Sequence, residues 1–241
     1  KAGDIFYKVN GEEVISLDID QIVSKLRGEE GTDVNITVLR GEMFEEYETT
    51  ATRAVIEVTS VAYEMKENQI GYIEVSGFEK ATLGQFERAL EDLKSQGMKG
   101  LIIDLRNNPG GNLSTVCDMV DLILPAGRIV YTETKDGARN FYYSDDAKQL
   151  DLPMAVLING NSASASEIFA GAIQDYEWGT IVGTTSFGKG IVQRVISLSD
   201  GSAVKFTPDG RNIHGIGIEP DVVVEYEYDD NQLERAMECL N

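Results

Sequence analysis

Histidine and cysteine are scarce in this chain of 241 residues, which has one His and two Cys. A Ser-His-Asp hydrolase would have to use His214, and the glycine-rich pattern around that residue is simpler to interpret as a loop without a proton-transfer role. Cys117 and Cys239 cannot build a disulfide framework, and neither has a histidine or basic flank that would stabilise a thiolate. Cys117 follows an apolar helical pattern, which predicts a buried thiol. Catalysis by histidine or cysteine is therefore disfavoured.

Basic residues and long apolar runs are also scarce. The chain has 21 Lys and Arg against 41 Asp and Glu, a net charge of −20, which repels phosphate and argues against a nucleic-acid partner. No apolar run reaches the ~18 residues of a membrane-spanning helix, and no signal peptide is recognisable. The sequence opens in mid-motif, so whether a leader or anchor segment precedes it is left open. The scattered carboxylates, single histidine and distant cysteines lack metal-ligand spacing, so we expect no metal and no cofactor.

Apolar runs alternate with helical patterns in the middle of the chain. The runs at 101–105 and 154–158 are almost entirely apolar, as in strands covered on both faces, and helices are expected at 113–124 and 166–176. This alternation predicts an α/β core with parallel strands.

The clearest helical pattern runs from 82 to 96. Thr82 and Gln85 have the spacing of a capping box, and Gly97 is the expected C-terminal stop. The buried stripe of this helix is expected to consist of Leu83, Phe86, Leu90 and Leu93.

The remaining patterns are mostly those of strands. Near the start, Asn10-Gly11 predicts a hairpin turn, followed by a helical pattern that ends at Gly28, an alternating strand at 34–40, and a linker or edge strand at 42–53. Asp136-Gly137 predicts a second hairpin, either a β-insert, which is the simpler interpretation, or a flap over a substrate. Further strands are expected at 70–75, 129–132, 140–143, 180–183, 191–196 and 203–206.

Three serines spaced by alanines, Ser162 to Ser166, occupy the junction between the run at 154–158 and the helix that follows. A serine at a helix start lies near unpaired amides and the positive end of the helix dipole, and such amides can hold a developing oxyanion. An N-cap is the simpler interpretation, but one cap explains one serine. It does not explain the alanines on both sides of Ser164, which leave room for a substrate.

Lys189 lies between Gly188 and Gly190, with Phe187 and Ile191 close by. An apolar setting disfavours the ammonium form of lysine, and a neutral lysine can take a proton from a serine hydroxyl. An ordinary surface lysine in a glycine turn is the alternative. Because histidine is nearly absent, a Ser-Lys pair is the better hypothesis.

A Gly-Gly corner, Gly110-Gly111, follows the strand at 101–105. Such a corner exposes backbone amides, although a plain strand-to-helix turn is the simpler interpretation. The glycine patterns of nucleotide sites are missing, so phosphate binding is not expected.

The stretches Ser162–Ile168 and Phe187–Gln193 together resemble the signature of the carboxyl-terminal processing peptidases, or tail-specific proteases. The resemblance covers nearly the whole chain. It implies a serine endopeptidase that cleaves proteins or peptides near their C-termini through a Ser-Lys dyad. Ile191 stands where the family often has threonine, a difference that touches no expected catalytic atom. The implied roles are nucleophile for Ser164, general base for Lys189, lysine-orienting residue for Gln193, and oxyanion amides for Gly110 and Ala165, with Gly111 as the alternative to Gly110.

The same resemblance implies a fold and a domain order. The core would be a crotonase/ClpP-like spiral of βα units with β-rich additions, at 70–241, preceded by a linker or edge segment at 44–69 and the C-terminal half of a PDZ domain at 1–43. Asp175 matches an acidic family position that we interpret as structural. An extracytoplasmic location, secreted or anchored at the cell envelope, is implied, and homo-oligomer formation is left open.

Two alternatives remain. A crotonase-type acyl-thioester enzyme would also use amide-based oxyanion stabilisation, but it would need a coenzyme A site and would not need Lys189. A non-catalytic PDZ-type peptide-binding or scaffold protein would need neither Ser164 nor Lys189.

Overall fold

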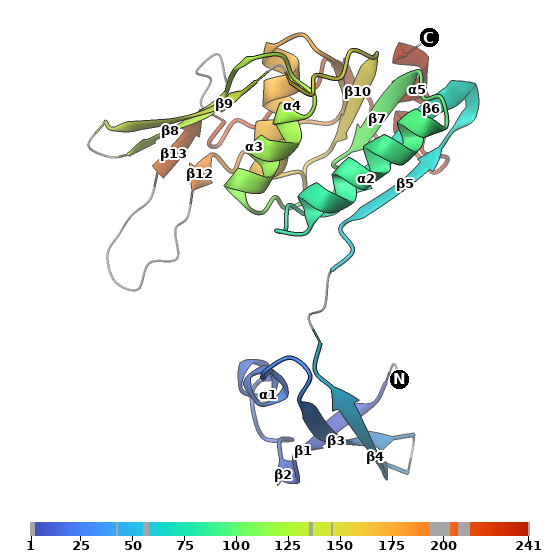
Figure 1. Cartoon of the computed structure of the whole chain (residues 1–241), viewed down its shortest axis with the longest axis vertical. Helices are drawn as coiled ribbons and strands as arrows, with labels where there is room; N and C mark the ends of the chain where they lie inside the picture. Colours follow the sequence, from blue (N-terminus) through green and yellow to red (C-terminus); the bar gives the residue numbers. More distant parts are fainter. Residues whose placement is uncertain are drawn as a thin grey trace. The chain divides into compact units, whose positions relative to one another are not determined.

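The computed structural model describes residues 3–41, 43–54, 58–134, 137–145, 147–192, 203–206 and 213–240. The chain forms two compact units, Lys1–Glu57 and Val58–Asn241, and each is described by itself (Figure 1).

The first unit is a small antiparallel sheet with one helix. It contains β1 (Ile5–Val9), β2 (Glu12–Glu13), α1 (Ile19–Leu26), β3 (Asp33–Arg40) and β4 (Glu45–Thr52). The strand order is β2-β1-β3-β4. Asn10 and Gly11 both have positive φ, 50° and 81°, between the paired residues Val9 and Glu12, which confirms the predicted hairpin.

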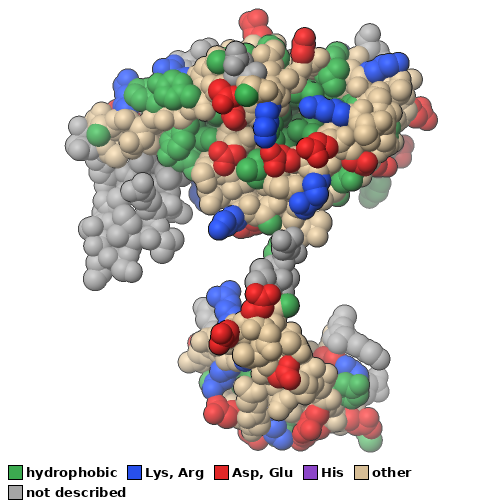
Figure 2. All heavy atoms as spheres, in the orientation of Figure 1, with side chains coloured by type: hydrophobic (Ala, Val, Ile, Leu, Met, Phe, Trp, Pro, Cys, Tyr) green, Lys and Arg blue, Asp and Glu red, His purple; other side chains and the backbone are tan. Residues whose placement is uncertain are grey.

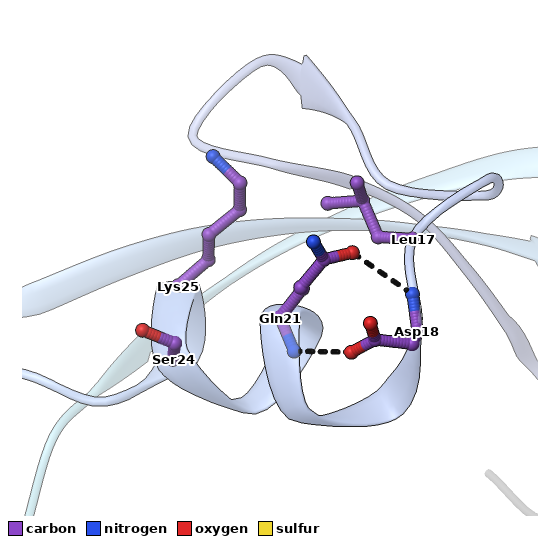
Figure 3. A pocket seen from close by; sticks show the side chains of 5 residues that line it. All are labelled: Leu17, Asp18, Gln21, Ser24 and Lys25. Atoms are coloured by element: carbon purple, nitrogen blue, oxygen red, sulfur yellow. Dashed lines mark hydrogen bonds between the residues drawn. The ribbon is translucent and has the colours of Figure 1, made fainter.

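Helix α1 begins with a reciprocal cap that sequence analysis had not identified. The Gln21 amide donates to Asp18 Oδ1 at 2.9 Å, and the Asp18 amide donates to Gln21 Oε1 at 3.1 Å (Figure 3). The inner face of the helix packs on Val9, Val14 and Val34. This unit therefore has a small apolar core of its own.

The second unit has a six-stranded sheet in the order β14-β11-β10-β7-β6-β5. Its strands are β5 (Val61–Met65), β6 (Ile70–Val75), β7 (Gly100–Asp104), β10 (Met154–Ile158), β11 (Thr180–Gly183) and β14 (Val222–Val223). Its helices are η1 (Glu67–Gln69), α2 (Thr82–Ser95), α3 (Leu113–Asp121), α4 (Ala165–Asp175) and α5 (Asn231–Cys239). Only β5 runs antiparallel to its neighbour, so the predicted parallel α/β core is confirmed.

Both faces of this sheet are covered, which explains why β7 and β10 are buried throughout. Leu101 and Ile103 pack with α2, α3 and α4, whereas Ile102 packs with α5 on the opposite face (Figure 1). A strand whose alternating side chains all meet a helix layer must be apolar on both faces. Asp104, at the carboxyl end of β7, departs from that rule and is buried with partners described below.

A smaller antiparallel sheet has the order β12-β13-β8-β9, formed by β12 (Ile191–Val192), β13 (Ala203–Phe206), β8 (Gly127–Thr134) and β9 (Arg139–Ser144). The hairpin of β8 and β9 is present as predicted, and Asp136 of its turn lies outside the described residues. Strand β12 begins two residues after Lys189, so this sheet continues directly from residues 186–190, called the lysine segment below.

The predicted capping box of α2 is wrong. Ala81, not Thr82, is the N-cap residue, and it makes no side-chain cap hydrogen bond. The Thr82 hydroxyl instead donates to the Gly77 carbonyl at 3.0 Å, and Gln85 Oε1 accepts from the Ser60 amide at 2.9 Å. Thr82 thus holds the turn after β6 and Gln85 the segment before β5, because buried amides and carbonyls there also require partners.

The segment predicted to separate the two domains contains strands of both units. Residues 44–69, expected as a linker or edge segment, contain β4, which pairs with β3, and β5, which pairs with β6. Each is an edge strand of its own sheet. The division between the two compact units falls between Glu57 and Val58, within this segment.

On the face shown in Figure 2, acidic and basic side chains are interspersed over the second unit and form no patch of one sign. Among the described residues, none of the helices has the length and apolarity needed to cross a membrane. Within the same residues, no group of three or more His, Cys, Asp or Glu side chains is arranged to hold a metal ion.

Candidate active site

The carboxyl ends of β7 and β10 bring together the Gly-Gly corner and the segment Ser162–Ser166, called the serine motif here. The two strands are parallel neighbours, so the turns that follow them meet at the same edge of the sheet. The Asn108 carbonyl accepts from the Ala163 amide and from the Ser166 hydroxyl, each at 3.0 Å. The Ser162 hydroxyl donates to the Leu105 carbonyl at 2.7 Å. These bonds hold the two turns against each other.

Ser164 differs from the serines on either side of it. Ser162 and Ser166 are fully buried, and their hydroxyls are used in the bonds just described. Ser164 is the residue directly before α4, and its backbone has φ 59° and ψ −107°. A non-glycine residue in this sparsely populated region costs of order 1–3 kcal/mol, and such strain is concentrated at active sites. A strained serine on a sharp strand-to-helix turn is the geometry of a nucleophile elbow.

Gly110 packs directly against this elbow. Its φ is +103°, and a Cβ atom placed on it would lie 2.6 Å from the Ala163 carbonyl oxygen and 2.7 Å from the Ser164 Cβ. Its amide donates to Asn108 Oδ1 at 2.8 Å. The neighbouring Gly111 packs on the Phe78 backbone, where its own Cβ would lie 2.5 Å from the carbonyl oxygen. Only glycine fits at either position.

If the chain cleaves peptides, as its resemblance to the processing peptidases implies, Gly110→Ala should reduce that cleavage by roughly a hundredfold or more, because the added methyl group displaces the turn at Ser164. Gly137→Ala is the matched control, since Gly137 also has a positive φ, +84°, but nothing lies within 4 Å of its Cβ position. Initial rates on one peptide would measure both effects. Cleavage by Gly110→Ala at the unmodified rate would show that the close packing of Gly110 on Ser164 is not needed for activity.

The lysine segment follows β11 and is attached to the serine helix by one buried carboxylate. Glu167, in the first turn of α4, is fully buried. Its Oε2 accepts from the Ser164 and Lys189 amides, each at 2.8 Å, and its Oε1 accepts from the Ser186 hydroxyl and the Gly188 amide, each at 2.6 Å. The Ser164 and Lys189 amide nitrogens share one acceptor atom, so they are no more than 5.6 Å apart (twice 2.8 Å).

Glu167 was not among the residues predicted to be functional. A signal was present, because Ser164-x-x-Glu167 has the spacing of a capping box, in which the acidic side chain bonds back to the N-cap amide. That bond is formed. The spacing gives no indication of the three further donors, which come from residues about twenty positions later.

The turn at 213–218 lies on the other side of the lysine segment. The Ser186 hydroxyl accepts from the Ile218 amide at 2.7 Å, and the Gly215 amide donates to the Gly188 carbonyl at 2.8 Å. A Cβ atom on Gly190 would lie 2.4 Å from the backbone nitrogen of His214, so close packing requires glycine at this position. His214 itself is exposed in this turn.

The remaining predicted residues are placed as follows. Ala165 is the first residue of α4, fully buried next to Gly110, and Asp175 is the last residue of that helix. Cys117 is buried, as predicted. Gln193 lies outside the described residues.

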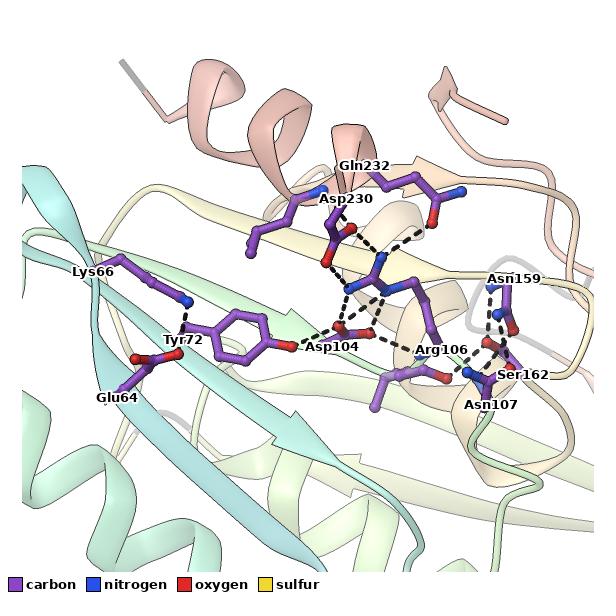
Figure 4. A network of polar contacts seen from close by, with 12 residues as sticks. Glu64, Lys66, Tyr72, Asp104, Arg106, Asn107, Asn159, Ser162, Asp230 and Gln232 are labelled. Carbon is purple, nitrogen blue, oxygen red and sulfur yellow. Dashed lines mark hydrogen bonds and ion pairs between the residues drawn. The ribbon is translucent and has the colours of Figure 1, made fainter. Parts of the chain in front are cut away.

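Beside the Gly-Gly corner, Arg106 forms a network of ion pairs with two carboxylates (Figure 4). Burial disfavours the charged guanidinium, but the hydrogen bonds to Asp230 and Asp104 outweigh it and hold the pKa of Arg106 above its ordinary value. The bond to Arg106 in turn lowers the pKa of Asp230. Burial, together with the Asp104 carboxylate, raises the pKa of Tyr72, whose hydroxyl donates to Asp104 Oδ2 at 2.7 Å.

This fold and site define a mixed α/β protein in which a strained serine at a helix start is joined to a lysine segment through a buried carboxylate. The chain belongs to peptidase family S41, whose model matches residues 69–224. The matched range includes the serine motif, the lysine segment and the Gly-Gly corner.

Curated proteins similar to this chain are proteases. A "probable CtpA-like serine protease" of Staphylococcus haemolyticus is 38% identical over 230 residues, which are 92% of this chain and 46% of that protein. A carboxy-terminal-processing protease of Bartonella bacilliformis is 39% identical over 238 residues, 93% of this chain and 54% of that protein. The chain therefore spans about half the length of the curated relatives it matches.

Among solved structures, the photosystem II D1 C-terminal processing protease matches this chain with a TM-score of 0.64 and 30% identity, covering all of this chain and 68% of that one. A protease from Bacteroides fragilis described as a member of S41 matches with a TM-score of 0.58 at 16% identity, which supports the fold alone. The fold is thus that of S41 protease structures.

Proposed function

We propose that this chain carries the catalytic part of a serine endopeptidase that cleaves protein or peptide substrates near their C-termini, with Ser164 as nucleophile and Lys189 as general base. One observation supports this most directly. The backbone amides of the two residues donate to a single oxygen of Glu167. The two amide nitrogens are therefore no more than 5.6 Å apart, a separation comparable to the length of a lysine side chain, which supports pairing of the Lys189 amine with the Ser164 hydroxyl.

In the proposed reaction, the Lys189 amine accepts the proton of the Ser164 hydroxyl while the serine oxygen attacks the peptide carbonyl carbon. The resulting tetrahedral oxyanion collapses, the C–N bond breaks, and charged Lys189 returns the proton to the leaving amine. Water then attacks the acyl-enzyme, giving its proton to Lys189, and the carboxylic acid product leaves as the Ser164 hydroxyl is restored. No metal or cofactor enters this scheme, and Gln193 would orient the lysine.

The oxyanion would be held by the amides of Ala165 and Gly110, as predicted. Ala165 follows the nucleophile at the start of α4, where helix amides lack intrahelical acceptors. The Gly110 amide donates to Asn108 Oδ1 in this conformation. It would therefore share its hydrogen with the oxyanion, or exchange one acceptor for the other, when substrate binds.

Further features of the proposal come from the family resemblance and the relatives. The second unit would be a crotonase/ClpP-like spiral, and the first unit the C-terminal part of a PDZ domain. An extracytoplasmic site of action is implied by the family resemblance. Assembly into a homo-oligomer is left open.

The proposal is tested by labelling the chain with a fluorophosphonate and mapping the adduct by peptide mass spectrometry. We expect one adduct, on Ser164, and cleavage of an unfolded protein at sites near its C-terminus under the same conditions. A coenzyme A thioester serves as the control substrate, because a crotonase-type enzyme would turn it over. Labelling confined to another serine, or turnover of the thioester without peptide cleavage, would contradict the proposal.

A further inference from the structure

The ion-pair network at Arg106 joins the C-terminal helix to the turns of the candidate site (Figure 4). Arg106 Nη1 donates to Asp230 Oδ1 at 2.5 Å and to Gln232 Oε1 at 3.2 Å, and Nη2 donates to Asp230 Oδ2 at 2.9 Å. Asp104 accepts from Nη2 at 2.6 Å and from Nε at 3.0 Å. The guanidinium has five N–H donors, and these contacts provide an acceptor for every one.

Arg106 is well placed to affect the candidate site because it connects β7 to the Gly-Gly corner. Its neighbour Asn107 makes a reciprocal pair with Asn159, in which the Asn107 amide donates to Asn159 Oδ1 at 3.0 Å and Asn159 Nδ2 donates to Asn107 Oδ1 at 3.1 Å. Asn161 Nδ2 also donates to Asn107 Oδ1, at 2.9 Å. Residues 159–161 lead directly into the serine motif. The position of Arg106 is therefore transmitted to both turns through hydrogen bonds.

Asp230 is the member of this network that comes from outside the site. It precedes α5 in the left-handed conformation, with φ 51° and ψ 49°, and its carboxylate also accepts from the Leu233 amide at 3.3 Å. Gln232 is buried and is oriented by the bond from its Nε2 to the Val224 carbonyl at 2.6 Å. The start of α5 thus presents two fixed acceptors to one arginine.

We propose that Asp230 is a positioning residue for catalysis, which acts through Arg106 to keep the turn at 107–111 in register with the nucleophile elbow. This inference rests on the proposed function. Without the Asp230 carboxylate, Arg106 keeps Asp104 and Gln232 but loses the charged partner of Nη1 and Nη2, and a half-buried guanidinium with weakened pairing moves toward water. Movement of Arg106 shifts Asn107, and with it the amide of Gly110 relative to the Ser164 oxygen.

The test is Asp230→Asn, because asparagine tolerates the left-handed conformation and still caps a helix, so the change removes mainly the charge. We expect kcat to fall about tenfold while KM stays within about twofold of its unmodified value. This is the effect of losing one charged hydrogen bond that stabilises the transition state more than the bound substrate. The affinity of the protein for a peptide aldehyde should fall by the same factor, because the adduct of the aldehyde with serine places an oxyanion near the amides of Gly110 and Ala165. Affinity for the cleaved product peptide should stay unchanged.

Glu238→Gln is the matched control, since Glu238 lies on the same helix in an exposed ion pair with Arg235 at 2.7 Å and has no link to the turns. This variant should leave kcat and aldehyde affinity unchanged. An Asp230→Asn variant with a lower melting temperature but unchanged kcat and aldehyde affinity would overturn the positioning role. That result would leave the proposed function intact. The proposed function is contradicted by a different result, cleavage of peptides by Ser164→Ala.

Discussion

Replacing Ser164 or Lys189 with alanine is expected to reduce cleavage of an unfolded protein substrate by about four orders of magnitude, the usual cost of losing a nucleophile or its base. Ser164→Ala removes the attacking oxygen, and Lys189→Ala removes the group that receives its proton. Both substitutions leave the Glu167 hydrogen bonds in place, because those bonds come from the backbone amides. The fold should therefore survive in both variants.

The measurement is the initial rate of substrate loss, with thermal unfolding recorded on the same preparations. Ser95→Ala and Lys148→Ala are the matched controls. Ser95 loses one exposed bond to the Asp92 carbonyl at 2.7 Å, and Lys148 loses an exposed pair with Glu87 at 3.0 Å, so both variants should cleave at close to the unmodified rate. Undiminished proteolysis by either alanine variant of the dyad would rule out the proposed mechanism.

Glu167→Gln is expected to have the second largest effect, although this side chain touches no reacting atom in the proposed mechanism. A carboxylate offers only acceptors, and all four groups that face Glu167 can donate. A glutamine must turn its NH2 group toward at least one buried amide, either at Gly188 or at Ser164 and Lys189. Each buried donor left without an acceptor costs about 1–3 kcal/mol.

We therefore expect Glu167→Gln to lower kcat by about a hundredfold, because the serine and lysine segments lose their common acceptor, and to destabilise the second unit by about 2 kcal/mol. Unfolding of that unit can be followed in urea by tryptophan fluorescence, since Trp178 is the only tryptophan and lies in it. Glu87→Gln, at a half-exposed position, is the control. A fully active, equally stable Glu167→Gln variant would show that the carboxylate does not hold the site together.

Much of the fold follows from local pattern. The strand at 154–158 and the α1 and α4 helices lie where apolar periodicity predicts them, and the turn at Asn10-Gly11 has the positive φ angles that its residues favour. These features depend on contacts between residues a few positions apart. The candidate nucleophile and base were likewise singled out by their immediate neighbours, since alanines flank Ser164 and glycines flank Lys189.

The sequence by itself thus determined the α/β alternation, the hairpins and the choice of Ser164 and Lys189 as candidates. Only the tertiary structure decided the partners of buried polar groups: Thr82 bonds to Gly77 instead of capping α2, Glu167 joins the serine and lysine segments, and Arg106 meets Asp230, 124 residues away. The physical reason is that a buried donor or acceptor takes whichever partner folding brings within about 3 Å. Local periodicity reports which side chains are buried, but it carries no information about which distant group they will meet.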